Sequence, residues 1–411
     1  MHPSERAASL LFPQKEPGLK VLYLSPYPPE HDGIGNYTWT LASTMRNTGI
    51  DVGVVVPRLQ PGSPPEVLGA IAAGARENSK LRSVIVRWNP DVIHVQFAIA
   101  AFGSRTGVLI RQIDSLRRDL KIPVIVTLHE FTRESAMLPI AGPAVYRRVA
   151  SHCDQLIVHT DIAMNAMVDR FGVPESKVTV IRHPSVRPQA VTASGDDLRT
   201  RFGLGNAKVM LAFGFIHVDK GLDDLVRALG LLRESGCAAL DEYVLVVAGA
   251  VRPRHGVFRA FEARDRLHFY RVMRLAQRKR IWDRLVLTGY VPIGEVASWF
   301  DLAEMVVLPY RRIDESGVAS LARSFAVPVL ASTAGGLAEQ FAGSRWSYPP
   351  HAPTQLAETL RRFLAATPAE RIGLPTAKRA DNLATVAART LEVYHTVIAA
   401  SRARSSLCWP G

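Results

Sequence analysis

Short apolar runs rich in β-branched residues recur along this chain, and amphipathic stretches separate them. In the first half, the runs lie at residues 20–24, 52–56, 92–96, 123–127, 156–159 and 178–181. Strands that are apolar along their whole length are typical of a parallel sheet that is covered by helices on both faces. The alternation of such strands with helices predicts a series of βαβ units.

A second series of the same kind follows later in the chain. Its runs lie at residues 208–213, 243–248, 285–288, 305–308 and 328–331. Residues 187–206, between the two series, are rich in proline, serine, glycine and charge, and we expect them to be a linker. The 411 residues therefore predict an N-terminal domain at 1–186, a second domain at 207–377 and, within 378–411, a last helix that crosses back to the first domain.

The expected fold class is α/β, with two doubly wound, Rossmann-like parallel sheets that face each other. Ligands of such sheets bind beyond the carboxyl ends of the strands. We therefore expect the ligand site in the cleft between the two domains.

The net charge of +13 favours anionic partners, which include nucleic acid, acidic lipid and nucleotide diphosphates. Nucleic acid is disfavoured because the sequence has no helix-turn-helix, zinc-finger or RNP-like pattern. The three cysteines, Cys153, Cys237 and Cys408, are far apart and are expected to be reduced thiols rather than metal ligands. The sequence has no apolar run of about 18 residues and no signal-peptide core, and we expect a cytoplasmic protein.

A glycine-rich turn follows the first apolar run. Gly33 and Gly35 precede Tyr37, Leu41 and Met45, which recur at helical spacing. The free N–H groups and the dipole of such a helix start favour an anion. An ordinary turn between a strand and a helix explains the pattern equally well. The full G-x-G-x-x-G fingerprint is absent, so NAD is not implied.

The second series begins with a similar turn. The run at 208–213 ends at Gly214, and Lys220 and Gly221 then open a helix. A lysine at the start of a helix places a cation beside free N–H groups, which suits a diphosphate. The alternative is an exposed loop lysine with no such role.

Two further helix starts carry glycine near the end of the second series. Glu315, Ser316 and Gly317 precede one helix, and Gly335 and Gly336 precede the next. Their positions after consecutive predicted strands place both helix starts at the same edge of the sheet.

Taken in order, these segments resemble glycosyltransferase family 4, whose fold is GT-B, over about residues 18–370. The segments are SPYPPEHDGIG, PDVIHVQF, VIVTLHE, CDQLIVHT, FGVPESKVTVIRH, FGFIHVDKG, LVLTGYVP, MVVLPY, ESGVASLA, VPVLAS and TAGGLAE. The resemblance implies a retaining transferase that moves a hexose-type sugar from a nucleoside-diphosphate sugar, with UDP or GDP as the nucleotide. The acceptor would be a hydroxyl group of a glycan, a lipid or a small natural product, and no cofactor or metal is expected.

The same resemblance implies catalytic roles for three side chains. His129 matches a histidine that contacts the transferred sugar and would act as a neutral hydrogen-bonding partner. Lys220 matches a lysine that pairs with the diphosphate, and Glu315 lies near a glutamate that orients the sugar. Attack would come from the face of the leaving phosphate, which helps to deprotonate the acceptor.

The resemblance also implies a set of donor-binding positions. Gly33 and Gly35 lie where the glycine loop of the family approaches the donor phosphate and the acceptor, and Tyr290 and Val291 lie where the nucleoside base is held. The remaining donor-binding positions are Gly214, Phe215, Lys220, Glu315, Ser316 and Gly317.

Three departures from the family pattern stand out. Phe215 occupies the place of an arginine, so one diphosphate cation is missing unless His217, Arg311 or Arg312 replaces it. Asp32 stands where a glycine is usual.

The family's second glutamate is also absent. Arg323 lies eight residues after Glu315, and alignment on residues 327–329 gives Leu321 instead. A catalytically weakened GT-B binding subunit therefore stays an alternative. An epimerase or a phosphorylase is a third class, although no pyridoxal-phosphate lysine motif is apparent.

Residues 252–284 are dense in arginine, with aromatic residues interleaved. They predict either a membrane-surface or polyanion contact or a solvated helix with buried aromatics. His94, inside an apolar run, is expected to be a satisfied core histidine.

Overall fold

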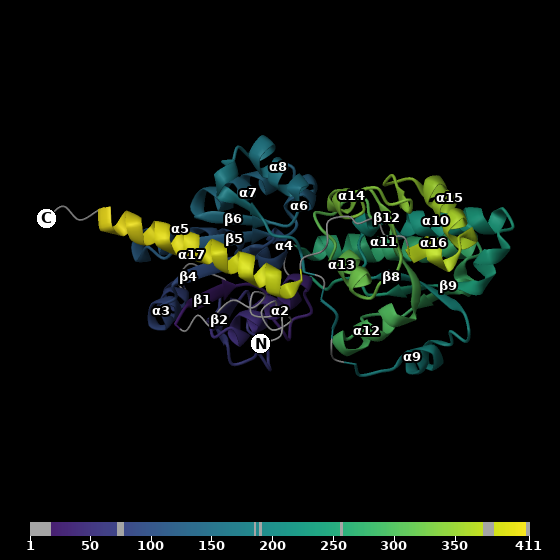
Figure 1. Ribbon diagram of the computed structural model, residues 1–411, viewed down its shortest axis with the longest axis horizontal. Helices are drawn as coiled ribbons and strands as arrows, with labels where there is room; N and C mark the ends of the chain where they lie inside the picture. Colours follow the sequence, from purple (N-terminus) through teal and green to yellow (C-terminus); the bar gives the residue numbers. More distant parts are fainter. Residues whose placement is uncertain are drawn as a thin grey trace, which may run out of the picture. The chain divides into compact units, whose positions relative to one another are not determined.

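A computed structural model describes residues 18–71, 78–184, 186–188, 191–254, 258–372 and 382–407. The chain divides into two compact units. Unit 1 comprises Met1–His183 and Asp381–Gly411, and unit 2 comprises Pro184–Ala380. Each unit contains one parallel sheet with helices packed against it (Figure 1).

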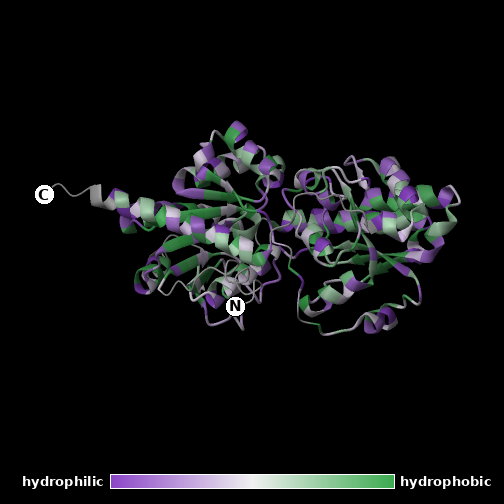
Figure 2. Ribbon diagram, viewed as in Figure 1, coloured by the Kyte–Doolittle hydropathy of each residue, from purple (hydrophilic) through white to green (hydrophobic). Residues whose placement is uncertain are grey.

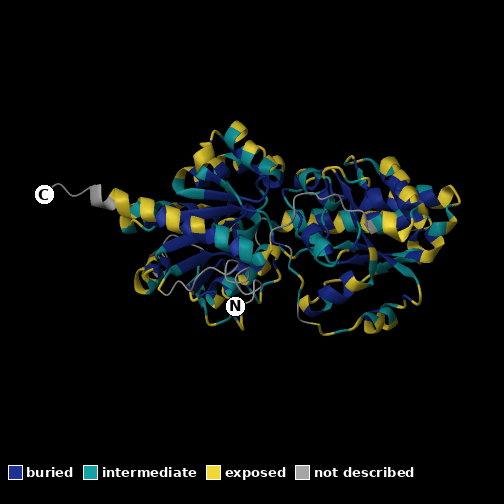
Figure 3. Ribbon diagram, viewed as in Figure 1, coloured by how far each residue is buried: buried dark blue, intermediate teal, exposed yellow. Residues whose placement is uncertain are grey.

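The sheet of unit 1 has seven parallel strands in the order β3-β2-β1-β4-β5-β6-β7. Their bounds are β1 (Lys20–Leu24), β2 (Asp51–Val56), β3 (Val67–Ala70), β4 (Val92–Phe97), β5 (Val124–Leu128), β6 (Gln155–Val158) and β7 (Val178–Val180). The central strands are hydrophobic and buried along their length, as Figures 2 and 3 show. Burial on both faces explains why these runs are largely apolar. In β4 the polar residues His94 and Gln96 are also buried.

Seven α-helices connect the strands in the described residues of unit 1. They are α2 (Gly33–Asn47), α3 (Asn78–Trp88), α4 (Ile99–Phe102), α5 (Thr106–Leu120), α6 (Phe131–Met137), α7 (Ala141–His152) and α8 (Asp161–Phe171). Helix α8 has clear end signals: Thr160 caps its first turn, and Gly172 ends it at a φ of 68°.

The C-terminal helix α17 (Leu383–Leu407) packs on the core of unit 1. Its buried stripe includes Val386, Leu391 and Val397. The hydroxyl group of Tyr394 lies 2.9 Å from the hydroxyl group of Tyr23 in β1. The helix is therefore joined to unit 1 by both apolar and polar contacts.

The sheet of unit 2 has six parallel strands in the order β10-β9-β8-β11-β12-β13. The strands are β8 (Lys208–Phe213), β9 (Tyr243–Ala248), β10 (Leu285–Leu287), β11 (Ala303–Leu308), β12 (Val329–Ser332) and β13 (Ser347–Tyr348). The helices are α9 (Gly195–Phe202), α10 (Leu222–Glu234), α11 (Arg259–Arg278), α12 (Ile293–Leu302), α13 (Gly317–Ser324), α14 (Gly336–Gln340), α15 (Pro353–Ala365) and α16 (Pro368–Ile372). The predicted α/β class with two doubly wound parallel sheets is confirmed.

The stretch expected to be a linker, 187–206, contains helix α9. Ser194 and Asp197 form a capping box at its start, and Leu198 is fully buried in the core of unit 2. Residues 195–202 are thus a folded part of unit 2. The expected domain end at residue 377, and Cys408, lie outside the described residues.

In each sheet the strand order reverses beside the first strand. The reversal lies between β1 and β4 in unit 1 and between β8 and β11 in unit 2. Doubly wound sheets bind ligands in the crevice beyond the strand ends at such a point. None of the helices in the described ranges is long and apolar enough to cross a membrane.

Candidate functional site

In unit 2, the chain leaves β8 through a close approach to the end of β9. Gly214 has a φ of 102° and its N–H donates to the carbonyl oxygen of Ala248 at 3.0 Å. A Cβ atom on Gly249 would lie 2.0 Å from the carbonyl oxygen of Gly214. Gly214 is required for its left-handed backbone and Gly249 for the closeness of the two loops.

Lys220 ends the short 3₁₀ turn η4 (Val218–Lys220), immediately before α10. Its Nζ lies 3.7 Å from the centroid of the Tyr310 ring, which follows β11. A Cβ atom on Gly221 would lie 1.8 Å from the carbonyl oxygen of Pro309, so the two loops touch. Lys220 is therefore held at the reversal point of the unit 2 sheet.

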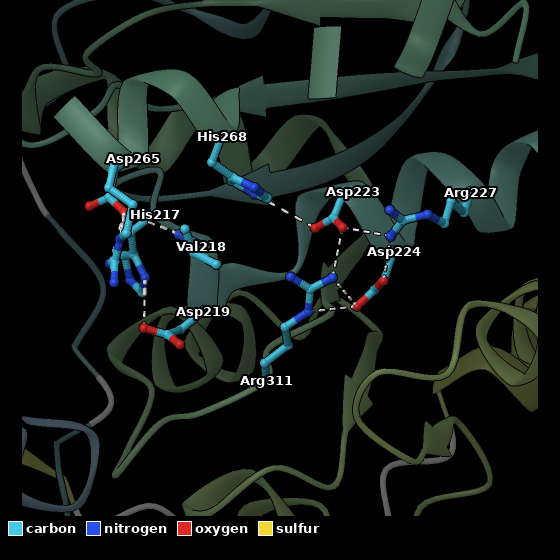
Figure 4. A network of polar contacts seen from close by, with 10 residues as sticks. His217, Val218, Asp219, Asp223, Asp224, Arg227, Asp265, His268 and Arg311 are labelled. Carbon is cyan, nitrogen blue, oxygen red and sulfur yellow. Dashed lines mark hydrogen bonds and ion pairs between the residues drawn. The ribbon is translucent and has the colours of Figure 1, made fainter. Parts of the chain in front are cut away.

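Asp223 and Asp224 in the first turn of α10 are buried and neutralised by arginines (Figure 4). Arg311 donates to Asp223 at 2.7 Å and to Asp224 at 2.9 Å. Arg227 also donates to Asp224, at 2.9 Å. Burial acts to raise the pKa of Asp223, but the hydrogen bond and charge of Arg311 outweigh it, and the pKa is lowered overall.

This network includes one of the three candidates for the missing diphosphate cation. Arg311 was a candidate, but its guanidinium is engaged by the two aspartates of α10. His217 lies 3.8 Å from a carboxylate oxygen of Asp219. Arg312 is exposed, and within the described ranges it forms no hydrogen bond or ion pair.

Glu315, Ser316 and Gly317 lie together at the start of α13. Ser316 caps the helix, with its Oγ accepting from the N–H of Ala319 at 3.2 Å. Glu315 Oε1 accepts from Gln340 Nε2 at 3.4 Å.

The start of α14 lies against this loop, at the next strand of the sheet. A Cβ atom on Gly335 would lie 1.9 Å from the carbonyl oxygen of Ile313, and Gly335 has a φ of 49°. The two glycine-bearing helix starts are therefore neighbours, after β11 and β12.

Tyr290 and Val291, the expected base-binding pair, differ in environment. Tyr290 is 42 % exposed, whereas Val291 is 8 % exposed and packs in the core. Both follow the edge strand β10. A base held here would meet the Tyr290 side chain, and Val291 would contribute through its backbone.

In unit 1, histidines follow three adjacent strands, β5, β6 and β7. They are His129, His159 and His183. The His129 and His159 rings are 5.0 Å apart, and the His159 and His183 rings are 5.8 Å apart. The ring of Tyr37 in α2 lies between 5.1 and 5.5 Å from all three. Four rings thus converge at the carboxyl ends of the strands.

Gln96 in β4 connects this cluster to the core. Its Oε1 is 2.8 Å from His129 Nε2, and its Nε2 is 3.2 Å from His94 Nε2. His94 is 1 % exposed and also contacts Tyr394 and Thr127 at 2.6 and 2.7 Å. It is the satisfied core histidine that was expected.

Burial sets the charge of these imidazoles. It lowers the pKa of His129 well below the usual value, and nearby histidines lower it further. Burial and the neighbouring His183 lower the pKa of His159 to about 3. At pH 7 both rings are therefore neutral. A neutral His129 can exchange hydrogen bonds with a sugar hydroxyl without adding charge.

The helix start at Gly33 and Gly35 is occupied by the chain itself. Asp32 Oδ1 accepts from the N–H groups of Ile34 at 2.8 Å and Gly35 at 3.1 Å. A Cβ atom on Gly35 would lie 3.3 Å from the backbone of Pro26. Close packing explains Gly35, and a phosphate role for Gly33 and Gly35 stays a prediction.

Four residues that the structure brings to these strand ends were not predicted to belong to the site. His159, His183 and Tyr37 lie around His129, and Arg252 lies beside Phe215. The signal for the two histidines was present, because LIVH and VIRH each end an apolar run.

Two family models match the chain, one after the other. The model of Glycosyltransferase Family 4 matches residues 31–184, and the model of Glycosyl transferases group 1 matches residues 196–379. The chain belongs to glycosyltransferase family 4. It is therefore a glycosyltransferase, and its two parallel-sheet units have the GT-B fold.

Named relatives agree with this assignment. The D-inositol 3-phosphate glycosyltransferase of Kineococcus radiotolerans is 25 % identical to this glycosyltransferase, over 89 % of this chain and 91 % of the relative. Sucrose-phosphate synthase from Thermosynechococcus elongatus has a TM-score of 0.73 at 18 % identity, over 93 % of this chain and 100 % of that chain. HepE from Anabaena, solved with UDP-glucose, has a TM-score of 0.67 at 14 % identity, over 92 % of this chain and 100 % of that chain.

Proposed function

We propose that this glycosyltransferase is a retaining enzyme that transfers a hexose-type sugar from a nucleoside-diphosphate sugar to a hydroxyl acceptor. The observation that carries the proposal is the position of Lys220, fixed on Tyr310 at the reversal point of the unit 2 sheet. A fixed ammonium group there suits the charge of a diphosphate leaving group.

Breaking the anomeric C–O bond leaves negative charge on the diphosphate and positive charge on the sugar. Lys220 would stabilise the diphosphate from one side. The backbone N–H groups at Ser316 and Gly317, which start a helix at an adjacent strand end, would stabilise the distal phosphate. In the proposed course the acceptor attacks from the face of the leaving phosphate, which takes the acceptor proton.

His129 and Glu315 would act on the sugar. His129 is neutral at pH 7, and its Nε2 is already positioned by Gln96 at 2.8 Å. It would therefore exchange hydrogen bonds with hydroxyl groups of the sugar rather than act as a strong base. Glu315, held by Gln340, would orient the sugar.

The proposed donor nucleotide is UDP, with GDP as the second choice. HepE, which shares the fold, was solved with UDP-glucose. The exposed ring of Tyr290 would contact the base. The proposed mechanism requires no metal, so activity should survive a chelator. The name of the Kineococcus relative makes D-inositol 3-phosphate the first acceptor to try.

The test is incubation with a panel of UDP- and GDP-sugars while free UDP or GDP is followed. Release that needs an added acceptor supports the transferase, and retention is read from the anomeric configuration of the product by NMR. If none of the nucleotide sugars binds or reacts, the proposal fails.

A second candidate is a catalytically weakened binding subunit. Phe215 and the absence of the family's second glutamate favour it. In the same assay, a weakened subunit would bind UDP or GDP but release none from the sugar, with or without acceptor.

The exposed side of α11 supports a further proposed contact, with an anionic membrane surface. The exposed residues of this fully described helix include five arginines and no carboxylate: Arg259, Arg266, Arg271, Arg274 and Arg278. Leu267 and Tyr270, on the same side, are 49 % and 54 % exposed. Basic residues around exposed apolar ones suit acidic lipid.

Co-sedimentation with vesicles of phosphatidylglycerol and phosphatidylcholine tests this contact. Arg271→Gln/Arg274→Gln should lose the salt-dependent binding, whereas Arg233→Gln/Arg361→Gln removes the same charge elsewhere on unit 2 and should keep it. Equal binding by both double variants would leave α11 as a solvated helix that buries Val272 and Ala276.

A further inference from the structure

The parallel pairing of β8 and β9 continues beyond the ends of both strands. The N–H of Ile216 donates to the carbonyl oxygen of Ala250 at 2.9 Å, and Ile216 forms a parallel bridge with Val251. Ile216 is 4 % exposed, and it and Val251 pack against the same core. Because side chains alternate along a strand, Phe215 and Arg252 share the opposite face.

Phe215 and Arg252 are in contact on that face. The Arg252 guanidinium carbon lies 5.8 Å from the centroid of the Phe215 ring, and both side chains are half-buried. A guanidinium group that is attracted to a ring keeps a planar array of N–H donors, which matches the oxygens of a phosphate. Phe215 therefore serves as a support for a cation at the carboxyl end of β8.

The arginines that neighbour this pair contact carboxylates. Asp265 in α11 accepts from Arg264 at 3.0 Å, lies 3.5 Å from Arg254 and accepts from the N–H of Val218 at 3.4 Å. This buried carboxylate thus ties α11 to the loop that carries Lys220 (Figure 4). Arg254 and Arg264 are its counter-charges. On the other side, Arg311 neutralises the aspartates of α10.

Arg252 and Lys220 lie near the ends of the two strands that flank β8. Arg252 follows β9 and Lys220 leans on Tyr310 after β11, and β9 and β11 are the two strands that flank β8. The loop from Gly214 to Lys220 therefore has one cationic side chain on each flank. A diphosphate carries two phosphate groups, and two flanking cations match its charge better than one.

We infer that Arg252, supported by Phe215, is the second cation that binds the donor diphosphate, opposite Lys220. This inference rests on the proposed function of the site. It assigns Arg252 as a binding residue for the leaving group and gives Phe215 a supporting function in place of a charge.

Titration of the full-length protein with UDP, UMP and uridine tests the assignment. Arg252→Gln should weaken UDP binding by roughly 10- to 100-fold, the scale of one charge-assisted contact to phosphate. Uridine binding should be unchanged, because uridine has no phosphate. Arg361→Gln on α15 is the matched control, since it removes the same charge from an exposed surface pair and should bind UDP as the wild type does.

Moving the charge gives a stricter test. Phe215→Arg/Arg252→Ala places a guanidinium at the adjacent position on the same face and should recover UDP affinity relative to Arg252→Ala alone. Phe215→Arg alone is the control, because the family has an arginine at this place. If Arg252 binds the phosphate, Phe215→Arg should raise the UDP affinity more in the Arg252→Ala background than in the wild type, whereas equal gains in the two backgrounds would mean that Arg252 has no such role. A thermal unfolding curve for each variant identifies those that fail to fold. The UDP affinities of Phe215→Arg/Arg252→Ala and Arg252→Ala are compared where the two variants unfold at the same temperature.

The outcomes separate the two proposals. If the wild type binds UDP or GDP and Lys220→Ala weakens binding, but Arg252→Gln binds as tightly as the wild type, then Arg252 is not the second cation. A loss with Arg312→Gln instead would assign that role to the exposed arginine after β11. No binding of either nucleoside diphosphate by the wild type overturns both the inference and the proposed function.

Discussion

The ammonium nitrogen of Lys220 lies 3.7 Å from the centroid of the Tyr310 ring. This contact joins the loops that follow β8 and β11, so it spans the point at which the strand order of unit 2 reverses. Tyr310 is 2 % exposed, and burial raises the pKa of its hydroxyl group, so the ring stays neutral. A cation–π contact of this kind contributes about 0.5–2 kcal/mol. It holds the amine where a diphosphate is expected to carry its charge.

Replacing Lys220 by alanine should lower kcat by roughly 10²-fold or more, the scale for removing a main stabiliser of transition-state charge. Lys208→Ala is the control, because Lys208 is a lysine of the same unit in a surface pair with Glu242. Initial rates of nucleoside-diphosphate release provide the measurement. Near-wild-type turnover in a folded Lys220→Ala variant would remove Lys220 from the site.

Arg311, unlike Lys220, should contribute to the stability of unit 2 and not to the binding of the donor. Arg311→Ala leaves Asp223 and Asp224 buried with Arg227 as the remaining arginine partner. We expect the free energy of unfolding to fall by about 3 kcal/mol, the lower end for breaking a buried pair. Urea unfolding measures this loss. The affinity of the folded fraction for UDP should change by less than about threefold, and a larger loss would place Arg311 at the phosphates.

The strands could be predicted because burial on both faces leaves a local pattern in the sequence, which is a short run of apolar residues. A strand covered on both faces is largely apolar, and the buried runs at β1, β5 and β9 show this directly. Strand β3 was missed because it is an edge strand whose four residues are only partly buried. Helix α9 was missed for a similar reason, since Leu198 is its one buried residue and no periodic stripe results.

A site residue could be predicted only where its own type and its neighbours in the sequence indicate its position in the fold. The strand-end position of His129 and the helix-start position of Lys220 are local features. The engagement of Arg311 is not local, because its partners lie 87 and 88 residues away. The contact between Arg252 and Phe215 likewise depends on the register of β8 and β9, which the sequence does not state.

Tyr394 should anchor the C-terminal helix through its hydroxyl group. That oxygen lies 2.9 Å from Tyr23 Oη and 2.6 Å from His94 Nδ1, all in the buried core of unit 1. Tyr394→Phe keeps the ring but leaves both partners short of a hydrogen bond, so the free energy of unfolding should fall by about 1–3 kcal/mol. Tyr270→Phe, on the exposed side of α11, is the control and should cost far less. Equal urea midpoints for the two variants would contradict the anchoring role.

The last prediction concerns pH and the buried imidazole of His159. Burial, with the neighbouring His183, lowers the pKa of His159 to about 3 in the folded chain. In the unfolded chain the pKa is about 6.5. Between these values the unfolded chain binds a proton that the folded chain does not, so the free energy of unfolding falls as the pH is lowered. More than about one unit above pH 6.5 the group contributes almost no pH dependence.

A His159→Asn variant isolates this contribution, because asparagine keeps an N–H near the carbonyl oxygen of Ile181 but does not titrate. From pH 7 to pH 5 the wild type should lose about 2 kcal/mol more stability than the variant. Both proteins contain His94, whose pKa is also lowered. Both also contain Glu134, whose buried carboxyl group has a raised pKa of about 7, so that its contribution to the pH dependence of stability has the opposite sign. The part of these shifts that burial causes cancels in the difference, whereas the contribution of His159 to the lowered pKa of His94 is removed together with the ring. Urea unfolding at the two pH values gives the comparison. Parallel pH profiles would mean that His159 is protonated in the folded chain at pH 5, and a charged ring beside His129 would then change the electrostatics of the proposed sugar site.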